Sequence, residues 1–276
     1  MHWNSWFKSS VLAGLFLGQS FAGTFVQIHL PFGDIDLELY DQDKPETVRN
    51  FLSYIQSGSY TNNMVVHRWD PGFVIQGGGF MVTNRTSDAV QIVPMRNTGA
   101  ITNEYSVGRK FSNTYGTIAM ARVGGQTNSA TSQWFLNLAN NAFLDSVDGG
   151  FTVFGKVIGS TNVLERFNRT DTANGIYRAN VGGALNHLPV MTASPSYDDL
   201  VFARITTLNI HIETSSDANR INWISIKNAT NIVEFSTSLP PQWATLVKTN
   251  GSGLPYKILD TAPGAKNRFY RVRVEH

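Results

Sequence analysis

Hydrophobic and polar positions alternate near the start of the chain in a pattern that predicts two paired strands. In TFVQIHLPFGDIDLELY, residues 24–40, the apolar residues Ile35, Leu37 and Leu39 are separated by acidic ones. A period of two is typical of a strand with one buried face. The turn sequence PFGD at 31–34 separates this strand from an earlier apolar run, so we expect a hairpin.

The spacing of apolar residues then changes and predicts a helix within DQDKPETVRNFLSYIQSG, residues 41–58. Its apolar face would consist of Val48, Phe51, Leu52 and Ile55. Asp43 and Glu46 have the spacing of a capping box, and Pro45 suits the first turn. Gly58 is expected to end the helix.

Short strand-like runs recur through the middle of the chain. They cover residues 64–80, 115–123, 132–138, 151–159 and 199–210. A second helix is expected over Thr161–Phe167, and residues 168–187, rich in Asn, Gly, Thr and Ala, are expected to form a long surface loop. Many short strands with two helices favour a mainly β fold, a closed or nearly closed antiparallel barrel that leaves few exposed edges.

The two ends of the chain differ from its middle. Residues 213–276 hold strand-length runs separated by Pro-Pro, Gly-Ser-Gly and Pro-Gly, which predicts a small β-sandwich-like C-terminal module. Residues 1–22 combine Lys8, a short apolar run and small residues before the expected cut after Ala22. This predicts a secretory signal peptide, too short to span a membrane; the alternative is a buried N-terminal strand or helix.

We therefore expect three parts: 1–22, 23–212 and 213–276. No later run reaches membrane-spanning length, so the mature chain is expected without a membrane span, in a periplasm or secreted. A net charge of +2 without a basic cluster argues against a nucleic-acid partner. The chain has no cysteine, and its six histidines lack ligand-type spacing, so we expect neither disulfides nor a metal.

Three segments carry the candidate chemistry. They are HRWDPGFVIQGGGF (67–80), TIAMARVGGQTNSATSQWFLN (117–137) and FLDSVDGGFTVFGKV (143–157). In this order and spacing they resemble the cyclophilin peptidyl-prolyl isomerases, especially the secreted bacterial type, from about residue 24 to about 210. The resemblance implies an eight-stranded barrel capped by two helices, a groove for proline-containing peptides on its outside, and no cofactor.

The reaction itself explains which residue types are needed. Resonance gives the bond before proline a rotational barrier of roughly 18–20 kcal/mol, and the twisted transition state regains a lone pair on nitrogen. A catalyst needs a donor aimed at that nitrogen and a dry pocket for the proline ring. Arg68 is the candidate donor because its guanidinium is always charged and offers five N–H groups. The alternative is a surface arginine stacked on Trp69.

By resemblance, the catalytic residues would be Arg68, Gln76 and Phe73, and the substrate-binding residues His67, Val74, Ala121, Arg122, Gln133, Phe135, Phe143, Leu144 and Phe151. Taken singly, each apolar member could equally be plain core. Gln76 and Gln133 would orient the arginine and hold substrate backbone. Ala121 and Arg122 would pair with the peptide like an added strand. His67 is interpreted as a structural hydrogen-bonding residue, because the rotation requires no proton transfer.

Several positions depart from the best-known members of the family. Val66 replaces a common Phe, Trp69-Asp70 replace two aliphatic residues, and Trp134 stands where Phe is usual. Phe143 occupies the place of the tryptophan associated with cyclosporin binding, so we expect only weak binding of that drug. Phe151 replaces a pocket histidine.

The triple glycine at 77–79 predicts a bulge and a close backbone approach. It lacks the Gly-Lys-Ser/Thr of a phosphate loop and the spacing of a dinucleotide-binding fingerprint.

Three hypotheses for the function follow from these features. The first is a cofactor-free isomerase that rotates Xaa–Pro bonds in unfolded secreted proteins and assists their folding. The second is a module that binds proline-containing segments, with incidental turnover. The third gives the main role to residues 213–276, as an element for surface attachment.

Overall fold

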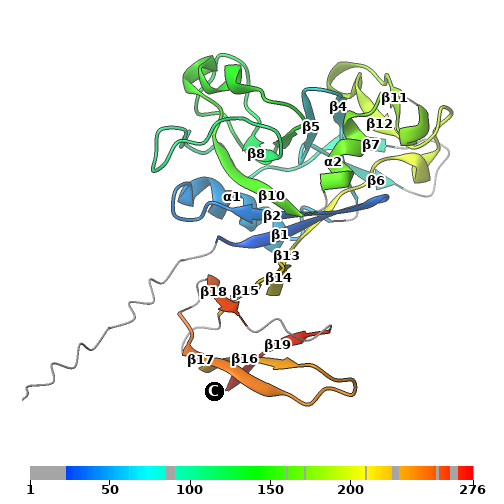
Figure 1. The fold of residues 1–276 in the computed structure, drawn as a ribbon. Helices are drawn as coiled ribbons and strands as arrows, with labels where there is room; N and C mark the ends of the chain where they lie inside the picture. Colours follow the sequence, from blue (N-terminus) through cyan, green and yellow to red (C-terminus); the bar gives the residue numbers. More distant parts are fainter. Residues whose placement is uncertain are drawn as a thin grey trace, which may run out of the picture.

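The computed structural model describes residues 23–61, 63–84, 91–159, 161–170, 172–208, 210–225, 230–252, 255–261 and 267–275. The signal peptide predicted over 1–22 lies outside the described residues. A larger body of β structure with two α-helices comes first along the chain, and a smaller all-β body follows it (Figure 1).

Eight antiparallel strands form one sheet in the order β13-β1-β2-β10-β8-β9-β5-β4. Their bounds are Arg204–Thr207 (β13), Phe25–Leu30 (β1), Gly33–Leu39 (β2), Val153–Gly159 (β10), Thr117–Met120 (β8), Trp134–Asn137 (β9), Val74–Gly77 (β5) and Arg68–Asp70 (β4). The sheet curls until the segments before its two edge strands meet. There, the Val66 N–H donates to the Val201 carbonyl at 2.9 Å, and the Ala203 N–H donates to the Met64 carbonyl at 2.8 Å. The predicted mainly β, eight-stranded antiparallel fold is confirmed.

Alternation along the strands separates the barrel interior from its outer surface. Ile35, Leu37 and Leu39 of β2 are fully buried and belong to the main core cluster, while the residues between them are only half-buried. The predicted hairpin is therefore present as β1 and β2. Their pairing runs from Phe25 opposite Glu38 to Leu30 opposite Gly33.

Two helices close the barrel core. They are α1 (Pro45–Gln56) and α2 (Thr161–Asn168), close to the predicted positions. Buried apolar residues of both belong to the main core cluster, among them Val48 and Phe51 of α1 and Leu164 and Phe167 of α2.

The predicted capping box of α1 is wrong. Lys44 is the N-cap residue, and its side chain makes no capping hydrogen bond. The carboxylate of Glu104, 57 residues beyond Thr47, accepts from the Thr47 N–H at 2.7 Å and from the Glu46 N–H at 3.1 Å. Asp43 instead accepts from the Arg109 N–H at 2.8 Å. A distant buried carboxylate therefore performs the function that the local pattern suggested for Asp43.

Short elements decorate the barrel. They are the strands β3 (Met64–Val65), β6 (Phe80–Asn84), β7 (Gln91–Pro94), β11 (Tyr177–Ala179) and β12 (Leu188–Val190), and the 3₁₀ turns η1 (Ala142–Asp145), η2 (Val147–Gly149), η3 (Thr172–Asn174), η4 (Gly183–Leu185) and η5 (Tyr197–Asp199). The long loop expected over 168–187 is therefore wrong, because this stretch holds η3, β11 and η4. Strand β11 pairs with β12 to form a hairpin.

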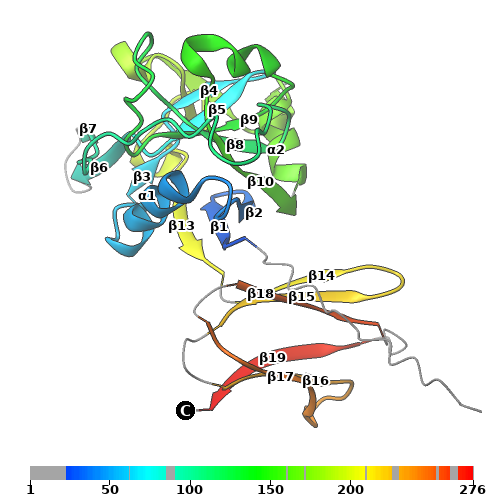
Figure 2. The ribbon, with the colours of Figure 1, turned by 90° about the vertical axis from the view of Figure 1, so that its left-hand side faces the viewer.

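The C-terminal part consists of two three-stranded antiparallel sheets, which Figure 2 shows stacked beneath the barrel. One contains β14 (Ile210–Thr214), β15 (Asn219–Ile224) and β18 (Pro255–Asp260), and the other β17 (Ala244–Asn250), β16 (Thr230–Ser236) and β19 (Phe269–Glu275). Trp223 of one sheet and Val233 of the other belong to the same buried cluster. The boundary predicted at residue 212 falls inside β14.

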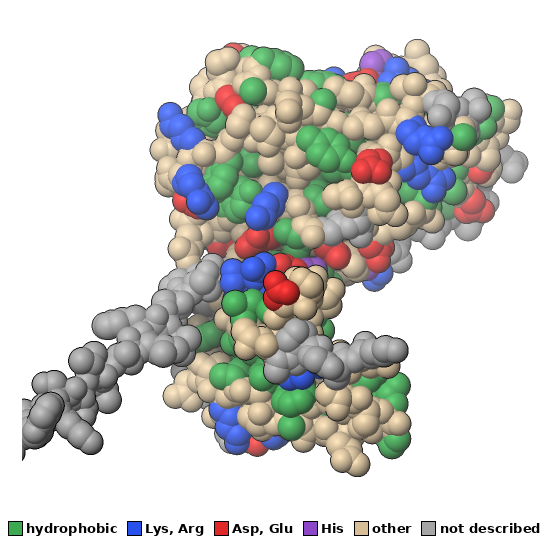
Figure 3. All heavy atoms as spheres, in the orientation of Figure 1, with side chains coloured by type: hydrophobic (Ala, Val, Ile, Leu, Met, Phe, Trp, Pro, Cys, Tyr) green, Lys and Arg blue, Asp and Glu red, His purple; other side chains and the backbone are tan. Residues whose placement is uncertain are grey.

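The two bodies meet at a ring stack and at a hollow lined by charged side chains. The ring of Phe25 on β1 stacks on His211 of β14 with centroids 5.2 Å apart. Charged side chains also gather at this junction (Figure 3), where a hollow is lined from both bodies, by Glu38 and Lys156 of the barrel and by residues of β14, β15 and β18. Among the described residues, no helix combines the length and apolar character that a membrane crossing requires.

Candidate active site

One row of side chains crosses five neighbouring strands of the barrel. Arg68 on β4 is opposite Gln76 on β5, and Gln76 is opposite Phe135 on β9. Phe135 is in turn opposite Ala119 on β8, and Ala119 is opposite Val153 on β10. Successive side chains of a strand point to opposite faces, and the neighbours of this row fill the barrel interior. The row therefore lies on the outer surface, where strand register brings polar and apolar groups together.

A hollow of about 210 Å³ opens over this row, and its floor is apolar. It is lined by Arg68, Phe73, Val74, Gln76, Ala121, Arg122, Phe135, Leu144 and Phe151. Phe135 and Leu144 are buried, and the Phe135 and Phe151 rings meet edge to face with centroids 5.8 Å apart. These apolar residues form a cluster separate from the main core. The structure thus brings together nine of the residues expected at the site, and the remaining three lie around them.

Arg68 is held on one side only. Its Nε donates to Asp70 Oδ2 at 2.7 Å, and its Cζ lies 5.5 Å from the centroid of the Phe73 ring. Within the described part of the chain, its terminal NH₂ groups donate to no protein acceptor. The alternative of stacking on Trp69 does not hold: Trp69 is buried and its Nε1 donates to the Phe167 carbonyl at 2.7 Å. Arg68 therefore presents free donors at the wall of the hollow.

The two glutamines contact each other. Gln76 Nε2 donates at 2.8 Å to Oε1 of Gln133, the residue before β9. The carboxylate of Asp70, rather than either amide, therefore accepts from Arg68.

His67 is buried beside this pair, with its ring 4.9 Å from that of Phe80. Burial lowers the pKa of His67 to about 4, and the Arg68 charge adds to this, while Gln133 opposes it. The imidazole is therefore neutral at physiological pH, which suits a structural residue.

Ala121, Arg122 and Phe143 form the rim. The Ala121 N–H donates to the Gln133 carbonyl at 2.9 Å, so this group is already engaged within the protein. Arg122 donates to the Asp148 carbonyl at 2.9 Å, and its Cζ lies 4.2 Å from the centroid of the Phe151 ring. It supports the wall instead of reaching across the hollow. The Phe143 side chain is 58% exposed and its ring stacks on that of Phe73 at 5.9 Å.

The glycine run allows Trp134 to pack against the backbone. A Cβ on Gly77 would lie 2.4 Å from Trp134 Cζ2. Gly78 has a φ of +77°, and a Cβ there would lie 2.3 Å from the Ser132 carbonyl oxygen. These positions require glycine because side chains of any kind would collide with Trp134 or with neighbouring backbone.

Sequence reasoning missed a buried amide network behind the hollow. Asn141 Nδ2 donates to the Phe73 carbonyl and to Asn137 Oδ1, both at 2.8 Å. Asn137 is fully buried and donates to Thr117 Oγ1 at 2.9 Å. Satisfied buried amides of this kind fix local geometry, and here they fix the turn that carries Phe73. The run NLANN directly after an apolar strand was the available signal.

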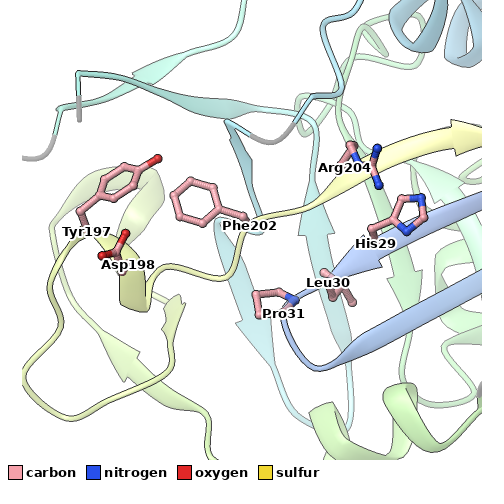
Figure 4. A pocket seen from close by; sticks show the side chains of 7 residues that line it. All are labelled: His29, Leu30, Pro31, Tyr197, Asp198, Phe202 and Arg204. Carbon is pink, nitrogen blue, oxygen red and sulfur yellow. The ribbon is translucent and has the colours of Figure 1, made fainter. Parts of the chain in front are cut away.

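A second hollow lies near the β1–β2 turn and shares no residue with the first (Figure 4). It measures about 380 Å³ and is lined by His29, Leu30, Pro31, Tyr197, Asp198, Phe202 and Arg204. The ring nitrogens of His29 are already engaged, by Asp34 at 3.1 Å and Thr206 at 2.9 Å. Its lining also contains two aromatic rings, Tyr197 and Phe202, but it carries the charged Asp198 and Arg204 and lies outside the row that Arg68 belongs to. The first hollow, with an apolar floor beside Arg68, is therefore the better candidate for a proline ring.

A family model and similar known proteins point to the same family. Residues 25–182 match the model of the family described as cyclophilin type peptidyl-prolyl cis-trans isomerase/CLD. A peptidyl-prolyl cis-trans isomerase of Acinetobacter baylyi is 40% identical over 166 residues, covering 59% of this chain and 82% of that protein. Peptidyl-prolyl cis-trans isomerase B of Escherichia coli is 39% identical over 149 residues, covering 51% and 82%.

A solved structure of a cyclophilin type peptidyl-prolyl cis-trans isomerase from Cryptosporidium parvum aligns with a TM-score of 0.47 and 21% identity, over 67% of this chain and 97% of that one. The family match covers more than half of the chain and includes every residue that lines the first hollow. The chain therefore belongs to the cyclophilin-type peptidyl-prolyl cis-trans isomerases, and it is an enzyme of that class.

Proposed function

We propose that this isomerase acts on Xaa–Pro bonds of exported proteins and assists their folding, with Arg68 stabilising the twisted bond. The observation that carries the proposal is the state of the Arg68 guanidinium. Its Nε is fixed by Asp70, while its terminal NH₂ groups are unengaged within the described residues, at the wall of an apolar hollow. A donor fixed in this way needs no reorganisation when the imide nitrogen regains its lone pair.

The energy required sets what else the site must do. Reducing a rotation time from about a hundred seconds to about a millisecond needs roughly 7 kcal/mol of preferential transition-state stabilisation. A hydrogen bond from a charged group contributes only about 1.5–3 kcal/mol net. The remainder is assigned to exclusion of water and to a fixed position of the proline ring against Phe73, Phe135 and Leu144.

The proposed clients follow from the chain's N-terminal sequence. Residues 1–22 have the features of a secretory signal, and a processed chain would begin at Gly23. Expression of the full chain in a Gram-negative host, followed by fractionation and mass spectrometry of the N-terminus, tests this. We expect a periplasmic protein that begins at Gly23; an intact chain confined to the cytosol would contradict export.

A refolding assay tests the role in folding. A secreted protein whose refolding has a proline-limited phase should refold faster with catalytic amounts of the wild type, and not with Arg68→Ala. A binding module with incidental turnover predicts a different result: stoichiometric binding of the unfolded client without faster refolding. The two outcomes separate the enzyme hypothesis from the binding hypothesis.

A further inference from the structure

We propose that Asp70 is a positioning residue for Arg68, and that Arg178 and His187 of the β11–β12 hairpin hold Asp70 in place. The inference rests on the role proposed above for Arg68. It assigns a part in the reaction to residues that lie outside the hollow and do not contact the substrate.

Both oxygens of the Asp70 carboxylate are engaged. Oδ2 accepts from Arg68 Nε at 2.7 Å. Oδ1 lies 2.6 Å from His187 Nδ1 and 3.4 Å from Arg178 Nη2. The Asp70 side chain is only 18% exposed, so solvent competes weakly for these contacts. A carboxylate held on two sides fixes the direction from which it binds Arg68.

The hairpin that supplies these partners is bound to the edge of the barrel sheet. β4 is an edge strand, and its outer backbone groups are taken up by the hairpin region, which lies beside it (Figure 1). The Trp69 N–H donates to the His187 carbonyl at 2.8 Å, and Arg178 Nη2 donates to the Trp69 carbonyl at 2.8 Å. The Arg178 Cζ also lies 5.7 Å from the centroid of the Trp69 ring. The position of the hairpin is therefore tied to the strand that carries Arg68.

Two members of this cluster stand apart from the family pattern. The match to the family model ends at residue 182, so His187 lies beyond it. Asp70 stands where an aliphatic residue was expected from the family resemblance. Asp70 thus departs from the family resemblance, and one of its two hairpin partners lies beyond the family match.

The distribution of charge explains how Asp70 can hold Arg68 without disabling it. A carboxylate paired with Arg68 alone would cancel most of the field that the guanidinium exerts on the substrate. Here Asp70 is shared with a second permanent cation, Arg178. The cluster therefore keeps a net positive charge, and the contact through Nε leaves the terminal NH₂ groups of Arg68 for the substrate.

Variants of Asp70 test this through kinetics. We expect Asp70→Ala to lower kcat/KM for an Ala-Pro peptide about tenfold, equivalent to about 1.4 kcal/mol. The loss should fall on kcat with little change in KM, because a misaligned donor affects the transition state and leaves the proline pocket intact. Asp70→Asn keeps an acceptor but loses the charge, so a smaller loss of about threefold is expected. His187→Ala, which frees one side of the carboxylate, should lose about twofold to threefold.

The double variant Arg68→Ala/Asp70→Ala separates positioning from a structural role. If Asp70 acts only through Arg68, the double variant should have the same kcat/KM as Arg68→Ala alone. The NMR resonance of the Arg68 Nε–H gives a second readout that does not depend on turnover, and it should move in both Asp70 variants. Asp34→Asn is the matched control. It removes the charge from a comparable Asp–His contact, 3.1 Å long, that lies elsewhere in the barrel, and it should leave both readouts unchanged.

The outcomes are distinguishable. Wild-type kcat/KM in Asp70→Ala, with Arg68→Ala impaired, would overturn this inference and leave the proposed function standing. A tenfold loss that persists in the Arg68→Ala background would also overturn it. Wild-type kcat/KM in Arg68→Ala would instead sink the proposed role of Arg68. If Asp70→Ala does not fold, the NMR and kinetic results for Asp70→Asn decide: an unmoved Nε–H resonance with an unchanged kcat overturns the inference.

Discussion

At Arg68 one guanidinium contacts a carboxylate and also lines an apolar hollow. The carboxylate of Asp70 holds Nε, and the Phe73 ring, which also lines the hollow, lies 5.5 Å from Cζ. Charge-assisted contacts of this kind are shorter and stronger than neutral ones, and they restrict the side chain to few rotamers. The arginine is consequently oriented before any peptide arrives.

The buried His67 predicts how the stability of the protein depends on pH. Its folded-state pKa of about 4 lies below the unfolded value near 6.5, so the unfolded chain binds the extra proton more readily. His67 therefore contributes no penalty above pH 6.5, and stability falls as the pH drops toward 4, by on the order of 2–3 kcal/mol. Urea unfolding of wild type and His67→Gln at pH 7 and pH 4.5 measures this. We expect the free energy of unfolding to change less between the two pH values in the variant than in the wild type. An equal change in both proteins would contradict a buried neutral imidazole.

Phe143 gives a prediction for drug binding. By the family resemblance this residue corresponds to the tryptophan associated with cyclosporin, and its exposed ring has no N–H to donate. Phe143→Trp should raise cyclosporin affinity about threefold to tenfold, the equivalent of one net hydrogen bond. Calorimetric titration of both proteins checks it. Nanomolar affinity of the wild type, with no gain in the variant, would show that the missing donor is unimportant.

Residue identities at the site were predictable where a long motif carried them. Arg68, Phe73 and Phe135 followed from segments whose order and spacing were specific, and strand register brings them together. The partners of Asp70 were not predictable, because Arg178 and His187 are more than a hundred residues away in sequence. A contact over that separation leaves no local pattern.

At the scale of elements, helix α1 shows how a local signal can mislead. Asp43 and Glu46 have the spacing of a capping box, yet the first-turn amides of α1 donate to Glu104. Lys44 is buried, and its Nζ donates to the Glu104 carbonyl at 2.9 Å. The helix start is therefore tied to the 104–107 segment. The acceptor at the helix start is a buried carboxylate from a distant segment, and the local spacing of Asp43 and Glu46 gives no information about burial.

Substitution of Glu104 tests this arrangement. Glu104→Ala should lower the free energy of unfolding by about 2–3 kcal/mol, because the buried Thr47 N–H and the partly buried Glu46 N–H lose their acceptor. Glu46→Ala is the matched control and should cost about 0.5 kcal/mol, since it removes an acidic side chain of the first turn and leaves the Glu46 N–H bonded to Glu104. Urea denaturation of the three proteins provides the measurement. A larger effect at Glu46 than at Glu104 would restore the capping box.

Other elements were predictable to different extents. Alternation identified the β1–β2 hairpin because one face of it lies in the core, and helical spacing identified α1 for the same reason. The β11–β12 hairpin was missed because its stretch is polar and glycine-rich. Its β11 burial pattern shows no buried position, so no periodic signal was available.

At the scale of the whole molecule, the C-terminal sheets have their own core, and none of their described residues lines the hollow. Trp223 and Val233 pack within that body, whereas the described residues that line the hollow all lie within 68–151. A chain that ends at Leu208 should therefore keep kcat/KM within about twofold of the full chain. Thermal unfolding should show some loss, because the stack of Phe25 on His211 disappears. A loss of activity of tenfold or more in a folded truncated protein would assign the C-terminal sheets a part in catalysis.

The most direct measurement is the exchange rate of an Ala-Pro peptide, followed by NMR with wild type and with Arg68→Ala. Arg271→Ala is a matched control, because Arg271 also has its Nε on a carboxylate, at 2.6 Å, and its Cζ 4.4 Å from an aromatic ring, but in the C-terminal sheets. We predict that Arg68→Ala lowers kcat/KM at least about a hundredfold, the cost of removing one fixed transition-state donor, while Arg271→Ala changes it little. Equal rates for wild type and Arg68→Ala would contradict the central claim that a fixed guanidinium favours the twisted bond.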